Sequence, residues 1–355
     1  MSSILQLIFA ISALIILHEI GHFLAARLLK VDVEEFGLGF PPRMLTLFEL
    51  GKTKYSLNWL PIGGFVRLKG ETDLEESAQP GSLQFAGPWT RLAIYFAGPL
   101  MNLLAAVIIY AVIVAQIGAP DFSQVLVVDV APSSPAAEAG LQDGDLITVV
   151  AGETIDSTDK LHNTIYDHLG ESISISYERD GETNNISLIP REMPPAGEGA
   201  IGIYMSNPVS QVGWIEALPM GAVATYNHAK LLVTLPGEII RGAIAPEMAR
   251  PVGYKGMYDI YQEVSEWESP VPESTVNLNI LQFFATITIS LGVINLLPIP
   301  ALDGGRILFT LPEIILRRKI PLVWQNTINA ISMTALLLLF FYINLMDFIK
   351  PISLP

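Results

Sequence analysis

The sequence contains no cysteine and few charged residues. Charged side chains make up 15% of its 355 residues, against roughly 25% in a typical soluble domain. The absence of cysteine excludes disulfides and thiolate metal ligands. The chain also lacks a glycine-rich phosphate loop and a basic cluster, and its formal net charge of −15 argues against binding to nucleic acid. Because the mean hydropathy is +0.45, an ordinary soluble enzyme is not expected.

The few charges are unevenly distributed along the chain. Residues 118–276 contain 23 acidic and 7 basic side chains, whereas the remainder contains 12 acidic and 13 basic side chains. This difference predicts that the acidic middle region lies in a polar environment. The segments on either side of it are nearly neutral and very apolar.

Four stretches are apolar and long enough to cross a bilayer core of about 30 Å. They cover approximately residues 3–29, 92–115, 280–297 and 328–349. The first is too long for the apolar part of a signal peptide and lacks a cleavage site of small residues. Residues 214–244 form a weaker stretch, because charged residues and prolines interrupt it. We expect an amphipathic interfacial helix there, with a fifth span as the alternative.

Basic residues near the spans indicate the orientation in the membrane. The loop between the first two spans carries eight Lys and Arg residues within 27–91, and the loop between the last two carries four within 306–319. We therefore expect both loops to be cytoplasmic. Residues 118–276 and both termini then lie outside an inner (plasma) membrane that the chain crosses several times.

The acidic middle begins with a soluble module. Residues 125–130 predict a strand, 136–140 a short helix that ends at a glycine, and 141–150 a turn followed by a strand. Residues 158–169 predict a second helix, and 172–177 alternate as in a half-buried strand. This order and the string Ser-Pro-Ala-Ala-Glu-Ala-Gly-Leu-Gln-Asp-Gly-Asp resemble a bacterial PDZ domain, which implies a peptide or protein ligand. An unrelated small β-rich domain is the alternative.

The first span contains the string His-Glu-Ile-Gly-His at residues 18–22. Histidines four residues apart lie on one face of a helix, so His18 and His22 can reach a single metal ion. Glu19 follows the first histidine and is close enough to handle a proton of a metal-bound water. Ionisable groups inside a bilayer span are costly and are functional candidates by default. The alternative is a pair of packed histidines hydrogen-bonded to other spans.

A catalytic zinc site usually has three protein ligands and one position for water. The other histidines lie in the outward-facing middle, so an acidic residue at the cytoplasmic end of another span is needed. Asp303 meets this requirement, because it follows the third span in a segment with two prolines before it and two glycines after it. By spacing alone, Asp303 is an equally good N-cap for a helix over residues 306–316.

Both motifs resemble the site-2 protease family of intramembrane zinc metalloproteases. The string Asn-Leu-Leu-Pro-Ile-Pro-Ala-Leu-Asp-Gly-Gly at 295–305 and the histidine motif are both complete, and the resemblance covers essentially the whole chain. It implies that His18, His22 and Asp303 bind zinc and that Glu19 is the catalytic base. It also associates Asn295 with substrate handling.

Three other segments resemble the family more loosely. Residues 36–40 are similar to its Gly-x-Gly membrane-associated loop, and residues 96–102 are similar to the motif that opens its second span. Residues 55–68 resemble its membrane-re-entrant β-hairpin, read as strand, glycine turn and strand. An exposed edge of that hairpin is our candidate for holding an unwound substrate by strand addition, through Gly63, Gly64 and Phe65. The chain has room for one PDZ domain, where some relatives have two.

The expected fold is a polytopic α-helical membrane protein of about four transmembrane helices, with a re-entrant β-hairpin and an inserted extracytoplasmic PDZ-like α/β domain. Its parts are expected at 1–117 and 277–355 (membrane domain), 118–195 (PDZ domain) and 196–276 (linker with an amphipathic helix). The implied activity is zinc-dependent cleavage of a single-pass membrane protein, such as an anti-sigma factor, near the cytoplasmic side of the bilayer.

Two other function classes compete with this interpretation. A PDZ-bearing membrane scaffold without protease activity has no need for Glu19 between two intact histidines. A metal or solute transporter predicts repeat symmetry and charged residues in several spans, and the sequence shows no internal repeat.

Overall fold

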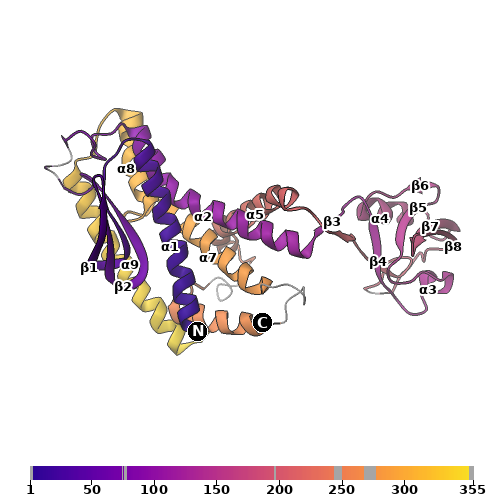
Figure 1. The fold of residues 1–355 in the computed structure, drawn as a ribbon. Coiled ribbons are helices and arrows are strands. Elements are labelled where there is room, and N and C mark those ends of the chain that lie inside the picture. Colours follow the sequence, from indigo (N-terminus) through magenta and orange to yellow (C-terminus); the bar gives the residue numbers. More distant parts are fainter. Residues whose placement is uncertain are drawn as a thin grey trace. The chain divides into compact units, whose positions relative to one another are not determined.

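The computed structural model describes residues 3–73, 75, 78–195, 197–243, 250–267 and 277–351. The chain divides into two compact units, one formed by residues 1–113 with 214–355 and the other by residues 114–213 (Figure 1). Each unit has its own apolar core.

Four helices in the described part of the chain are long and apolar enough to cross a membrane. They are α1 (Ser3–Leu28), α2 (Pro88–Ile117), α7 (Leu278–Leu296) and α9 (Leu322–Ile349). They correspond to the four apolar stretches of the sequence. Many apolar side chains of these helices are exposed, as expected for helices that contact lipid. In α9 the most apolar part has none of its residues buried inside the protein. Helix α5 (Trp214–Ile240), over the weaker stretch, is not among them.

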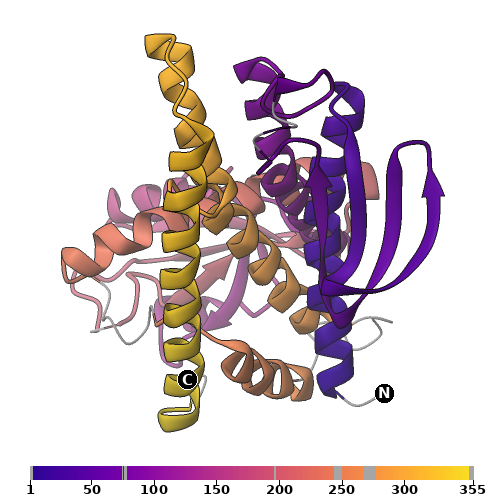
Figure 2. The same ribbon diagram turned by 90° about the vertical axis from the view of Figure 1, so that its left-hand side faces the viewer.

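The strands β1 (Val33–Leu50) and β2 (Thr53–Leu68) form a long hairpin alongside α1 (Figure 2). Both strands bend in the middle, so each strand contributes two paired segments to the sheet. Phe36 lies opposite Val66 on one side and Tyr55 on the other, and Tyr55 also lies opposite Phe48. The expected hairpin within 55–68 is therefore wrong: these residues form one bent strand, and the first half of β1 lies between its two halves.

The expected loop at residues 36–40 is also part of this sheet, because these residues lie within β1. An ion pair between the exposed Arg43 and the buried Glu35 joins the two sides of the bend in β1. The carboxylate of Glu35 accepts hydrogen bonds from Arg43 at 2.8 and 2.5 Å and from the Ser56 hydroxyl at 2.7 Å. Burial opposes ionisation of Glu35, but the hydrogen bonds from Arg43 and Ser56 lower the pKa of its carboxyl group.

Three further helices complete the described part of this unit. Helix α5 packs against α2 and α7, where the Tyr110 hydroxyl lies 2.8 Å from Nδ1 of His228 and accepts a hydrogen bond from Gln282 at 2.9 Å. Helix α6 (Tyr254–Glu266) was not expected from the sequence, and its Tyr261 packs in one apolar cluster with Leu7 of α1. Helix α8 (Asp303–Leu316) follows the turn after α7.

The unit of residues 114–213 contains a sheet in the order β8-β7-β5-β4-β9, with β6 paired to β5. Its elements are β3 (Ala119–Pro120), β4 (Val125–Val130), α3 (Pro135–Ala139), β5 (Leu146–Val150), β6 (Glu153–Thr154), α4 (Thr158–Tyr166), β7 (Ile173–Arg179), β8 (Glu182–Leu188), β9 (Ile203–Ser206) and β10 (Val209–Ser210). Gly140 ends α3 in the left-handed conformation. Because β9 pairs with β4, the unit extends beyond the bound of 195 that the sequence suggested.

Candidate metal centre

Helix α1 presents two histidines and a glutamate in successive turns. His18 and His22 are four residues apart, so their rings project from the same face, and both are buried. The helix can approach α2 closely because Gly21 has no side chain: a Cβ atom there would lie 2.3 Å from the carbonyl oxygen of Ala97. Gly98 serves the same purpose from the other helix, since a Cβ atom there would lie 2.3 Å from Nε2 of His22.

Asp303, at the first position of α8, faces the two histidines. Its Oδ2 atom lies 3.1 Å from Nε2 of His18 and 3.2 Å from Nε2 of His22, and the two nitrogens are 3.1 Å apart. A tetrahedral zinc ion with bonds of roughly 2.0–2.1 Å places its ligand atoms about 3.3 Å apart. The two imidazole nitrogens and the carboxylate oxygen therefore suit zinc, both in the chemistry of the donor atoms and in the distances between them. Among the described residues, they are the only such group of metal-binding side chains.

The turn before α8 explains how a residue 281 positions away reaches His22. Helix α7 ends at Leu296, and the chain reverses over the next six residues to begin α8 at Asp303. Gly304 allows this tight packing, because a Cβ atom there would lie 2.1 Å from the carbonyl oxygen of Leu297. The N-cap position is occupied by Leu302, and the carboxylate of Asp303 contacts the histidines. The alternative assignment of Asp303 as an N-cap is therefore wrong.

The nitrogens of the histidines that face away from Asp303 also have partners. Nδ1 of His22 lies 2.8 Å from the carbonyl oxygen of Ile94, to which it donates as an N–H. Nδ1 of His18 lies 3.3 Å from the side-chain amide of Asn102 on α2. Such contacts fix the orientation of metal-binding histidines.

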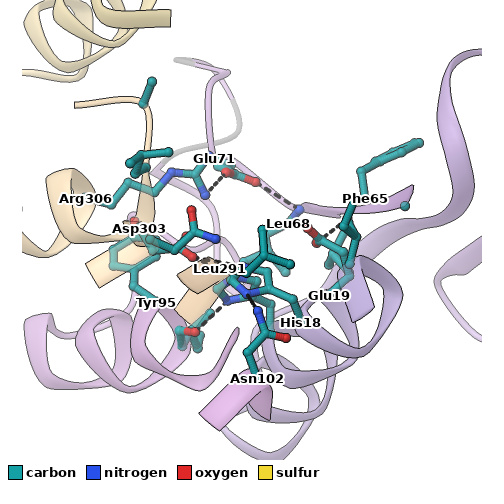
Figure 3. A pocket seen from close by; sticks show the side chains of 18 of the residues that line it. His18, Glu19, Phe65, Leu68, Glu71, Tyr95, Asn102, Leu291, Asp303 and Arg306 are labelled. Atoms are coloured by element: carbon teal, nitrogen blue, oxygen red, sulfur yellow. Dashed lines mark hydrogen bonds and ion pairs between the residues drawn. The ribbon is translucent and has the colours of Figure 1, made fainter. Parts of the chain in front are cut away.

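Glu19 connects the cluster to the hairpin. Its Oε2 atom accepts a hydrogen bond of 3.0 Å from the backbone N–H of Val66 in β2. A cavity of about 460 Å³ lies over the cluster (Figure 3). The side chains that line it come from α1, both hairpin strands, α2, α7, α8 and α9, and they include Glu19, Phe40, Phe65, Tyr95, Leu291, Asn295 and Met333.

A second ion pair borders the cavity. Arg306, one turn after Asp303, lies 2.6 Å from a carboxylate oxygen of Glu71, and its guanidinium group lies 5.8 Å from the centre of the Tyr95 ring. The charge of Glu71 raises the pKa of Arg306. The other oxygen of Glu71 accepts from the backbone N–H of Leu68 at 3.3 Å. Glu71 therefore joins the end of β2 to the helix that carries Asp303 (Figure 3).

The structure brings most of the predicted site residues together. Gly64, Phe65 and Asn295 line the cavity with the histidine cluster. Gly63 is not among the lining residues in the described part of the chain, and its N–H donates to the Ser12 hydroxyl at 3.1 Å.

Four residues at the site were not predicted from the sequence, namely Val66, Glu71, Asn102 and Arg306. Only two had a usable signal: Arg306 directly follows the Asp-Gly-Gly string, and Asn102 ends the second-span motif.

Known proteins are similar to this chain over nearly its whole length. Residues 6–339 match the model of Peptidase family M50. A Clostridium perfringens protein named "Putative zinc metalloprotease" is 31% identical over 345 residues, which cover 97% of each chain. "Zinc metalloprotease RasP" of Geobacillus kaustophilus is 26% identical, covering 99% of this chain and 98% of the relative. "Regulator of sigma-W protease RasP" of Bacillus subtilis is 25% identical, covering 98% of both.

A similar solved structure covers a smaller part of the chain. The PDZ domain of the SdrC-like protein from Listeria monocytogenes is 26% identical to this chain. The match covers 24% of this chain and 88% of that domain, with a TM-score of 0.22.

Proposed function

The chain belongs to peptidase family M50, the site-2 protease family, and from this premise we propose that it cleaves a peptide bond in or near the transmembrane segment of a membrane protein. Its four apolar helices make it an integral membrane protein, and its relatives are named zinc metalloproteases. The observation that carries the proposal is the convergence of His18, His22 and Asp303 within 3.2 Å of one another. In the proposed enzyme these three residues bind zinc.

Zinc, when bound, acts as a Lewis acid on the scissile carbonyl group and lowers the pKa of a bound water to about 7. Glu19 follows the first ligand and lines the same cavity. Its carboxylate accepts a proton from the attacking water and passes it to the leaving amine. The hydrogen bond from Val66 holds this carboxylate in place, so the hairpin orients the base.

A helical peptide bond is shielded by its own hydrogen bonds, so the substrate must unwind before cleavage. The second half of β2 supplies an edge for the unwound segment, because its other side is paired with β1. Gly64 and Phe65 lie on this edge and line the cavity, and Asn295 lines it from α7. We assign these residues to substrate binding. Gly63 supports the bend.

The proposed topology places the loops 27–91 and 306–319 in the cytoplasm and residues 118–276 outside. The hairpin then enters the membrane from the cytoplasmic side, and several of its large apolar side chains are exposed, including Met44, Leu47, Phe48, Trp59 and Leu60. The proposed PDZ-like domain, outside the bilayer, binds peptides and screens substrates.

The proposed substrate is a single-pass membrane protein that regulates transcription, such as an anti-sigma factor. Support comes from the Bacillus subtilis relative, which is named a regulator of sigma-W protease and matches over nearly its full length.

The experiment compares cells whose only copy is the wild-type chain with cells whose only copy is Glu19→Gln. Newly formed protein termini are identified in membrane and cytoplasmic fractions by mass spectrometry. The proposal predicts termini inside or next to predicted transmembrane segments in wild-type cells and their absence in the variant, with equal amounts of both proteins. The same set of such termini in both strains would show that the chain does not cleave through Glu19.

A further inference from the structure

The two histidines of the metal centre differ in what holds their second nitrogen. His22 Nδ1 faces a backbone carbonyl oxygen, which can only accept, so this nitrogen carries the hydrogen and Nε2 presents its lone pair. His18 Nδ1 instead faces the side-chain amide of Asn102, with Nδ2 at 3.3 Å. An amide offers both a donor and an acceptor, so its orientation decides which tautomer of His18 it supports.

The positions of the three proposed ligand atoms decide which tautomer of His18 metal binding requires. Its Nε2 atom is the one that approaches His22 and Asp303, so metal binding requires a lone pair there and a hydrogen on Nδ1. An N–H of Asn102 cannot pair with an N–H of His18. The Oδ1 atom of Asn102 can, and it is buried without a hydrogen-bond partner among the residues that the structure describes.

We propose that Asn102 is a positioning residue for the metal centre: its amide turns so that Oδ1 accepts the Nδ1–H of His18 and holds the Nε2 lone pair toward Asp303. This inference rests on the proposed metal site of the protease. It gives His18 the same kind of support that Ile94 gives His22, and it provides a partner for a buried oxygen atom that otherwise lacks one.

The backbone of Asn102 is fixed independently of its side chain. Asn102 is completely buried, and its backbone carbonyl oxygen accepts a hydrogen bond of 3.2 Å from the Thr288 hydroxyl on α7. It lies one turn after Gly98, whose missing side chain leaves room for the two histidine rings. A substitution at Asn102 therefore tests the amide, whereas Thr288→Val tests the packing of α2 against α7 without changing the amide.

The test measures the zinc dissociation constant of the purified full-length protein by competition with a chromogenic chelator. The Asn102→Leu variant has no acceptor and is expected to bind zinc about 10- to 100-fold more weakly, the usual cost of losing such a partner. The Asn102→Asp variant has only acceptors and is expected to stay within about threefold of wild type. Thr288→Val is expected to match wild type. Cobalt substitution provides a second readout, because the Leu variant should change the visible spectrum and the Asp variant should not.

Unchanged zinc affinity in a folded Leu variant would overturn the proposal. So would a loss in the Asp variant as large as that in the Leu variant, because that result would mean that the amide donates to His18. If the Leu variant does not fold, the Asp variant decides alone: a zinc affinity within about threefold of wild type supports the proposal, and a loss of about 10-fold or more overturns it. Since the readout is metal affinity, a wild-type protein that binds zinc but cleaves nothing contradicts the proposed activity and leaves this inference standing.

Discussion

Glu19 and Val66 join the histidine helix to the substrate edge of the hairpin through a hydrogen bond of 3.0 Å. The carboxylate on α1 thereby contacts the backbone of the strand that we propose holds the substrate. The first prediction follows from this contact. Glu19→Gln keeps an oxygen that can accept from Val66 but cannot act as a base at neutral pH. We expect it to keep its fold and its zinc while losing about 10²- to 10⁴-fold in cleavage rate.

Thermal unfolding, zinc content and cleavage rate of the same preparations check this prediction. Glu19→Ala is the comparison, because it removes both the base and the acceptor and should also lower the unfolding temperature. Cleavage by the Gln variant at the wild-type rate would exclude Glu19 as the base.

The second prediction concerns the metal ligands. Asp303→Ala removes one of three convergent donors, so purified protein should lose most of its bound zinc and its activity. Asp156→Ala is a matched control, because this exposed carboxylate lies in the other unit. Metal content measured by mass spectrometry should be about one zinc per chain in wild type and control. Full zinc content in Asp303→Ala would refute the assignment of this ligand.

The third prediction uses the space that Gly98 leaves for the histidines. In Gly98→Ala, the new methyl group would lie 2.3 Å from Nε2 of His22 and 2.8 Å from Nε2 of His18. The rings must shift, so we expect weakened zinc binding and a cleavage rate at least tenfold lower, since small misplacements at a site have large costs.

Gly237→Ala is the control for this substitution. Gly237 is also helical, and a Cβ atom there meets nothing within 4 Å. This variant should bind zinc and cleave as the wild type does. Wild-type zinc affinity in Gly98→Ala would show that the histidine cluster does not need this close approach.

The fourth prediction concerns the ion pair between Glu71 and Arg306. Glu71→Gln leaves the guanidinium group of Arg306 without its carboxylate partner beside the cavity. We expect a loss of unfolding free energy of roughly 1 kcal/mol, because the pair is only partly buried and solvent reduces the cost of losing one partner. The double variant Glu71→Gln with Arg306→Gln should recover part of this loss. Denaturant unfolding of Glu71→Gln, Arg306→Gln and the double variant measures the coupling. Additive losses would mean that the two residues do not act together.

Local patterns in the sequence predicted the parts of the site that lie within one element. The spacing of His18 and His22 depends only on the helical repeat, and the four apolar stretches depend only on composition. The place of Asp303 could not be decided from spacing, because a helix cap and a metal ligand have the same local sequence. Its contact with His18 joins residues 285 positions apart, and only the tertiary fold decides it.

The hairpin shows why strand arrangement was harder to predict. Residues 55–68 read as two strands around a glycine turn, yet they form one strand with a bend at Pro61 and Gly63. The first half of β1 pairs with both parts, and no pattern within 55–68 indicates that a third segment lies between them. Asn102 was missed for a similar reason, because its contact with His18 depends on how closely two glycines let α1 and α2 approach.

The proposed activity is hydrolysis of peptide bonds within membrane spans through zinc and Glu19. The most direct measurement uses zinc-loaded wild-type protein in liposomes with a panel of synthetic single-span peptides, half of which carry a helix-weakening glycine pair. Mass spectrometry then maps the products. We expect cuts inside or next to the spans, with more cuts in the weakened peptides. These cuts should disappear with a zinc chelator and in zinc-loaded Glu19→Gln. Cuts that persist unchanged in that variant would contradict the proposed activity.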